Sequence, residues 1–148
     1  MRTTKVGMFA AMLALAGCGS SAKFANKPRP AIPVDLTVYI NNARVSLSPS
    51  KVGAGEVIFI VTNQADRAES LTVHPAGDSS RQLADTGPIQ PQATAQVTVD
   101  LRNPGEYTVG TAPSGQSQAQ LATATKIQPA ALHIGPARAN SNGVLLQP

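Results

Sequence analysis

A chain of 148 residues has the length of one domain, and 42% hydrophobic residues with a formal net charge of +4 are ordinary for a folded soluble protein. Only 14% of the residues are charged and there is no Trp, whereas Gly and Pro number 12 each. This composition favours short strands joined by turns over a helix-rich enzyme. The charge is also too small to indicate a nucleic-acid partner.

The first 17 residues have the anatomy of a secretory signal. Arg2 and Lys5 form a basic start, and an apolar run from Val6 to Ala16 follows. That run is shorter than the roughly 20 residues that a membrane-spanning helix needs. It ends in Leu15-Ala16-Gly17-Cys18, which resembles the lipobox of bacterial lipoproteins. The resemblance implies that Cys18 is lipidated and becomes the mature N-terminus.

Lipidation would make Cys18 a membrane anchor on the extracytoplasmic side of a bacterial envelope, because each buried CH₂ of an acyl chain contributes about 0.8 kcal/mol. No cofactor is expected besides this covalent lipid. Cys18 is the only cysteine, so an intramolecular disulfide is excluded. Removing the signal leaves ten basic residues against eight acidic ones. An exported chain of that balance is expected to meet a membrane and another envelope protein rather than nucleic acid.

Residues 18–33 are predicted to be the lipidated cysteine and a flexible tether. The stretch "GSSAKFANKPRPAIP" from Gly19 to Pro33 is small, polar and rich in proline. Lys23, Lys27 and Arg29 would either attract anionic headgroups weakly or be solvated linker charges, and the second interpretation is favoured.

Alternation of apolar and polar residues predicts about seven short strands in residues 34–135. A glycine-rich turn is expected before the third strand, a short helical turn near Ser80 to Ala84, and a hairpin across Asn103-Pro104-Gly105. The pattern predicts an all-β fold, a Greek-key β-sandwich. The expected strands are Val34–Ile40, Ala43–Ser48, Glu56–Thr62, Glu69–Pro75, Ala93–Leu101, Glu106–Thr111 and Ala131–Gly135.

The tail, residues 136–148, would pack its apolar Val144-Leu145-Leu146 on the sandwich or dock a partner, and packing is favoured.

Three stretches of this region resemble the cupredoxin family of blue copper proteins: "EVIFIVTN", "ESLTV" and "GPIQPQATAQVTVDLRNPGEYTV". The resemblance covers Val34 to Gly135 and implies a cupredoxin-like fold. Tyr107 lies where Greek-key sandwiches place a corner tyrosine, whose hydroxyl bonds back to the turn backbone. Asn63, at the end of a strand, is expected to be a turn residue.

The resemblance also shows which copper ligands the sequence lacks. The first histidine of the family falls on Glu69 or Ser70, and its cysteine falls near Gly110 or Thr111. The second histidine and the methionine belong in the loop Ala112 to Pro129, which contains neither residue type. All three methionines lie in the signal, so no soft sulfur ligand remains for a blue copper centre. The resemblance therefore implies the fold without electron transfer, and no copper is expected.

The two histidines give the only other candidate metal site. Alternation places both His74 and His133 on polar faces of their strands. If those faces met near Glu69 or Asp78, they would supply a weak zinc or copper(II) site. Two solvent-facing histidines are the favoured interpretation.

No pattern for catalysis is present. "PSGQS" around Ser114 lacks the strand and helix that a nucleophile elbow requires, and no phosphate-binding loop precedes a helix. The sequence therefore predicts a non-enzymatic, lipid-anchored module that contacts a protein or a small ligand through the loops at one end of the sandwich. The alternative is a copper or zinc carrier that uses His74 and His133.

Overall fold

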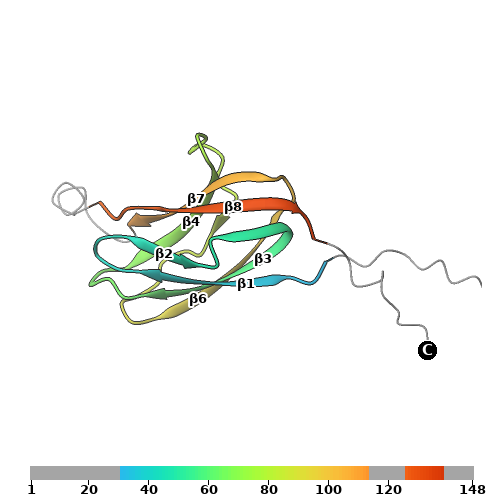
Figure 1. Cartoon of the computed structure of the whole chain (residues 1–148). Coiled ribbons are helices and arrows are strands. Elements are labelled where there is room, and N and C mark those ends of the chain that lie inside the picture. The colour runs from blue at the N-terminus through green and yellow to red at the C-terminus, as the bar shows by residue number, and fades with distance from the viewer. Residues whose placement is uncertain (1–30, 114–125, 139–148) are drawn as a thin grey trace, which may run out of the picture.

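The computed structural model describes residues 31–113 and 126–138, and this part of the chain is all-β, as predicted. Eight strands form two packed layers (Figure 1). The first layer has the strand order β2-β1-β3-β6, and the second has the order β3-β8-β7-β4-β5. Because β3 belongs to both layers, the strands form one continuous mixed sheet that folds over on itself. The strands are β1 (Val34–Ile40), β2 (Val45–Ser48), β3 (Lys51–Asn63), β4 (Glu69–Pro75), β5 (Ala84–Asp85), β6 (Thr94–Leu101), β7 (Gly105–Pro113) and β8 (Ala130–Ala137).

Alternating side chains from both layers form the core. On β1, Leu36, Val38 and Ile40 are fully buried, and their neighbours on β3 are equally buried. Burying one such side chain contributes about 1.5–3 kcal/mol, so the facing strands hold the layers together. The fully buried side chains of the core are Leu36, Val38, Ile40, Val57, Phe59, Val61, Leu71, Val73, Val109, Leu132 and Ile134.

Strand β3 passes from one layer to the other through a bend at Gly53 to Gly55. The glycines lie within the strand and not in the expected turn before it, because β3 already begins at Lys51. The first residues of β3 run parallel to β8. After the bend, its later residues run in the reverse direction and are parallel to β1 (Figure 1). Gly55 has a φ of 139°, which L side chains rarely adopt. A Cβ on Gly53 would lie 2.5 Å from Cγ of Arg138 and 2.9 Å from the Pro136 carbonyl oxygen. Arg138 lies across the bend and donates to the carbonyl oxygens of Ala54 and Glu56.

Two further local predictions are wrong. The turn at Asn103-Pro104-Gly105 is not a hairpin, because β6 pairs with β3 while β7 pairs with β4 and β8. It carries the chain between layers, since the apolar faces of both strands must point into one core. Near Ser80 to Ala84 there is no helical turn. Ala84 and Asp85 instead form β5, which pairs with Thr72 and Val73.

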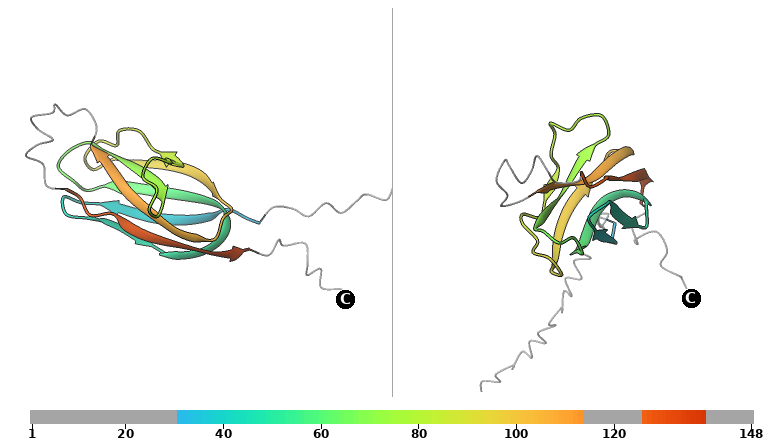
Figure 2. Two further views of the ribbon diagram at one scale, coloured as in Figure 1. Left: turned by 90° about the horizontal axis from the view of Figure 1, so that it is seen from above. Right: turned by 90° about the vertical axis from the view of Figure 1, so that its left-hand side faces the viewer.

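The two ends of the sandwich differ in what they carry. Ala31 to Val34, the turn between β6 and β7, and Arg138 lie at one end, which we call the tether end (Figure 2). Asn63 to Glu69, Ile89 to Ala93 and the start of β8 lie at the other, which we call the loop end. Strand β8 continues past the expected boundary at Gly135 to Ala137.

The predictions for the signal, Cys18, the lysines and arginine of the tether, Ser114 and the apolar tail fall outside the described residues. Within residues 31–113 and 126–138, no helix is long and apolar enough to cross a membrane.

Candidate functional site

Asn63 organises the loop end. It is the last residue of β3 and is fully buried. Its Nδ2 donates to the carbonyl oxygens of Arg67 and Ile89, both at 2.8 Å, and its Oδ1 accepts from the Ala65 amide at 2.9 Å. Asn63 is therefore the turn residue that was predicted. It also joins the loop after β3 to a second segment distant in sequence, and nothing in the local pattern indicated this.

A buried ion pair lies directly beside this turn. Glu69 begins β4 on the side that also carries Leu71 and Val73, and its side chain is 1% exposed. Nε of Arg67 donates to Oε1 of Glu69 at 2.5 Å, and the Arg67 side chain is 23% exposed. The backbone of Glu69 also exchanges two hydrogen bonds with Ile89. The backbone of Glu69 is thus fixed by Ile89, and one oxygen of its carboxylate is bound by Arg67.

The second oxygen of this carboxylate has no partner in the described part of the chain. Oε2 of Glu69 is buried without a hydrogen bond. An ionised carboxylate away from water is costly unless it is paired, so the guanidinium of Arg67 is what permits a charge at this depth. The loop end therefore holds a buried anion whose cation is supplied by the chain itself.

The residues at the predicted ligand positions do not fit a copper ion. Glu69 carries a carboxylate already bound by a guanidinium, and Ser70 is a buried hydroxyl. On β7, Thr111 lies opposite Leu71, and Gly110 has no side chain. A type 1 site needs imidazole and thiolate ligands, and none of these four residues offers either. An incoming cation would also meet the positive charge of Arg67.

His74 lies on the outer face of the second layer, as alternation predicted. It is half-buried, opposite Thr108 on β7, and its Nδ1 is buried without a partner. Because Glu69 is on the core side of the same strand, it does not face His74. Asp78 lies in the turn after β4, where its Oδ1 accepts from Oγ of Ser80 at 2.6 Å. This hydrogen bond is the main reason that the pKa of the Asp78 carboxyl is lowered.

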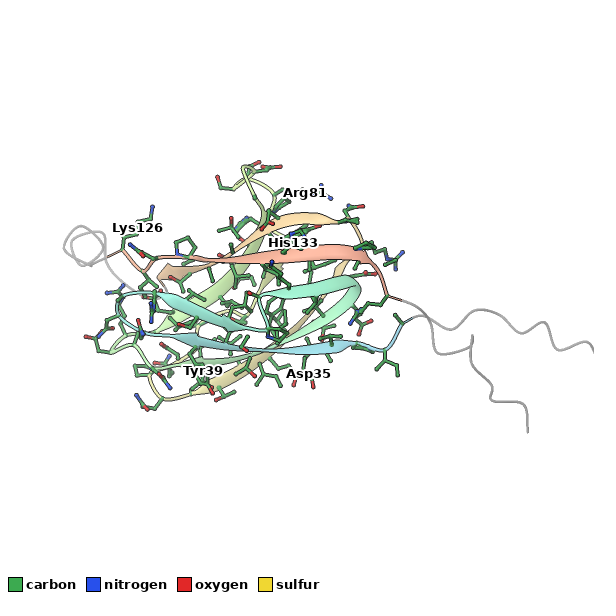
Figure 3. All side chains as sticks on the ribbon, in the orientation of Figure 1. Asp35, Tyr39, Arg81, Lys126 and His133 are labelled. Atoms are coloured by element: carbon green, nitrogen blue, oxygen red, sulfur yellow. The ribbon has the colours of Figure 1, made fainter. Side chains whose placement is uncertain are left out.

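His133 is exposed on the same outer face, on β8 (Figure 3). Its Nδ1 lies 2.6 Å from Oε1 of Glu106, the neighbouring residue on β7. Strand β7 separates β8 from β4, so His74 and His133 share a face without adjoining each other. No cluster of three or more His, Cys, Asp or Glu side chains that could hold a metal is found among the residues described.

Tyr107 makes the contact expected of a corner tyrosine. Its ring is buried, and its hydroxyl donates to the carbonyl oxygen of Asn103 at 2.7 Å. The bond spans the turn that joins the two layers. Tyr107 thus fixes the tether end, as Asn63 fixes the loop end.

Arg67 is the residue that the sequence analysis missed. An arginine two residues before a strand-initial Glu is compatible with a solvated pair, and no alternation pattern distinguishes the buried case. The signal that was available is the position of Glu69 itself. A carboxylate on the apolar side of "ESLTV" requires a cation within reach.

The chain is similar to known proteins in structure only. No protein-family model matches the sequence, and no curated protein matches it. Three solved structures similar to the chain are an auracyanin from Roseiflexus castenholzii, auracyanin B and a copper-containing nitrite reductase from Thermus scotoductus. Their sequence identities are 12%, 17% and 17%, and their TM-scores are 0.45, 0.49 and 0.44.

The alignment with the first auracyanin covers 73% of this chain and all of that protein. With auracyanin B it covers 73% of this chain and 91% of that protein. With the nitrite reductase it covers 74% of this chain and 28% of that protein. At these identities and scores, the likeness says nothing of what this chain binds or does.

Proposed function

We propose that the chain is a lipid-anchored protein of the bacterial cell envelope, with a copper-free, non-catalytic sandwich that binds a protein partner or a small ligand at its loop end. Cys18 would carry the lipid on the extracytoplasmic side. The observation that carries the proposal is the buried pair of Arg67 and Glu69, which stands where the cupredoxin resemblance implies a metal ligand.

This pair supports binding in place of electron transfer. A guanidinium in contact with the carboxylate supplies a positive charge to the site without a metal, and it cannot change its redox state. Asn63 fixes the surrounding loop through three side-chain hydrogen bonds. A rigid loop end with no redox centre is suited to recognition, because preorganised loops lose less conformational entropy on binding.

The direction of the chain supports the same proposal. The described chain begins at Ala31 at the tether end, and the loops lie at the opposite end of the sandwich (Figure 2). A lipid on Cys18 would therefore hold the tether end toward the membrane and present the loop end to other envelope components.

Subcellular fractionation of the variant Cys18→Ala tests the anchor. The wild-type chain should sediment with membranes, and the variant should leave the membrane fraction while residues 34–138 keep their fold. A variant that unfolds, or that stays on the membrane to the same extent, would contradict the anchor.

Photo-crosslinking in cells tests the recognition surface. A crosslinking amino acid at the exposed loop-end positions Gln64 and Gln90 should give discrete adducts, with Asn103 at the tether end as the matched control. Adducts from Asn103 alone would place recognition at the wrong end.

Calorimetric titration with Cu(II) and Zn(II) tests the alternative, a metal carrier. Micromolar binding that is lost in both His74→Ala and His133→Ala would favour the carrier. Metal binding that is absent, or that both substitutions leave unchanged, would exclude the carrier and favour the recognition module.

A further inference from the structure

The tether end carries a hollow of about 430 Å³ between the turn after β4 and the turn that joins β6 to β7. Pro75, Leu83, Pro104 and the ring of Tyr107 supply its apolar surface, and four charged side chains line the rest. The volume suits a small ligand rather than a peptide. This hollow is at the opposite end of the sandwich from the proposed recognition loops.

The carboxylates in the lining are already paired. Oδ2 of Asp100 accepts from Nε of Arg102 at 2.6 Å, and Oε1 of Glu106 lies 2.6 Å from Nδ1 of His133. The hydroxyl of Tyr107 is also occupied, because it donates to Asn103. Each of these three lining residues therefore has a hydrogen-bond partner, and one other charged side chain of the lining is an exception.

That exception is Arg81. Its side chain is exposed at the rim of the hollow, above β7 (Figure 3), and makes no side-chain hydrogen bond or salt bridge within residues 31–113 and 126–138. Asp78 is an anion that attracts the Arg81 guanidinium. The Asp78 carboxylate already accepts hydrogen bonds from the hydroxyl and the amide of Ser80 and from the backbone amide of Arg81, and its attraction to the Arg81 guanidinium is the smallest of the influences on it. Arg81 thus presents an uncommitted guanidinium beside an apolar surface.

We propose that this hollow binds a small oxyanion, a phosphate or a carboxylate, that carries a short apolar group. Arg81 would bind the anion through the paired N–H groups of its guanidinium, whose planar geometry matches two oxygens of such a group. Arg102 also lines the hollow, and besides the Nε that it gives to Asp100 its guanidinium has further N–H groups. The apolar part of the ligand would lie on Tyr107 and Leu83.

The bound anion could come from a lipid headgroup or from solution, and the hollow lies where either source can reach it. A second hollow of about 540 Å³ shares Asp100 and Arg102 with the first and is lined by Ala31 and Pro33, where the described chain begins. An anionic lipid headgroup is therefore one source, and this source alone rests on the proposed lipid anchor. A free organic anion of the extracytoplasmic space is the other source.

NMR titration of the full chain tests the proposal. In non-ionic detergent, sodium phosphate and hexanoate represent the free source. In nanodiscs, phosphatidylcholine with and without phosphatidylglycerol represents the lipid source. The signals to follow are the Nε–H of Arg81 and the backbone amides of Leu83 and Tyr107.

We expect saturable shifts of these signals, and about a tenfold weaker affinity in Arg81→Gln, as for the loss of one charge-assisted contact. The matched control is Arg44→Gln, which removes one exposed arginine at the loop end and should leave the affinity unchanged. Shifts with free anions alone would identify a soluble ligand, and shifts with phosphatidylglycerol alone would identify a headgroup.

Absence of shifts in both arms would overturn the proposal. So would an equal loss of affinity in Arg81→Gln and Arg44→Gln, because this would show attraction to net charge without a site. Failure of the anchor has a separate readout, the fractionation of Cys18→Ala, so the two proposals can fail independently.

Discussion

The ion pair at the loop end can be tested by removing its cation in the variant Arg67→Met. Methionine keeps the apolar stem of the arginine and leaves Glu69, whose side chain is 1% exposed, without its partner. Breaking a buried ion pair costs about 3–5 kcal/mol of unfolding free energy. Because Arg67 is 23% exposed and admits some water, we expect the lower end, about 3 kcal/mol. A single domain has only about 5–15 kcal/mol in total, so the loss should be large.

Equilibrium unfolding in urea, followed by far-UV circular dichroism, measures this loss. Arg67 has further interactions besides the one with Glu69, so a double-mutant cycle is needed to isolate the pair. The double variant Arg67→Met/Glu69→Leu removes both charges and should recover stability to within about 1 kcal/mol of wild type.

Two results would refute this reasoning. One is a single variant that unfolds within about 0.5 kcal/mol of wild type, as an ordinary surface substitution does. The other is a coupling energy near zero in the cycle, which would show that the two side chains act independently.

Three further predictions concern residues away from the pair. Gly53→Ala should lower the unfolding free energy by about 1–3 kcal/mol, because its Cβ would overlap Arg138 and the Pro136 carbonyl, and urea unfolding measures this. Tyr107→Phe should lower the unfolding free energy by about 1 kcal/mol, because the hydrogen bond to Asn103 is lost. An unchanged unfolding free energy in urea would contradict this. Ser80→Ala should raise the pKa of Asp78 toward its ordinary value, because the main hydrogen bond that lowers it is removed; NMR titration of the carboxyl carbon measures this, and a pKa that stays low would contradict it. Because a depressed folded pKa stabilises the fold above the unfolded pKa and this contribution is lost as pH falls, any difference in stability between Ser80→Ala and wild type should be present at neutral pH and disappear at acidic pH.

Much of the fold could be predicted because strands with one buried face show a period of two. Val34–Ile40 and Glu69–Pro75 begin and end where the alternation begins and ends. The corner position of Tyr107 followed from its place after a Pro-Gly turn. These features are local, so a single sequence contains them.

The errors and omissions concern features that depend on parts of the fold distant in the chain. A turn sequence such as Asn103-Pro104-Gly105 specifies a reversal but not whether the next strand pairs within the same layer. The bend in β3 depends on Arg138, more than 80 residues later by the span of its hydrogen bonds. At the candidate site, the resemblance implies that Glu69 or Ser70 takes the place of a metal ligand, and this stays a prediction. The burial of Glu69 against Arg67 could not be predicted, because the depth of a side chain depends on the whole fold.

The parallel pairing of β1 with β3 has a mechanical consequence for a tethered domain. Seven consecutive positions of β1, from Val34 to Ile40, are in register with β3. If a partner held the loop end while the tether pulled on Val34, the force would run along β1 and load these backbone contacts in shear, all at the same time. Contacts loaded in this way resist extension far better than contacts that open one by one. Strand β1 would then carry the mechanical load between the tether and a partner bound at the loop end.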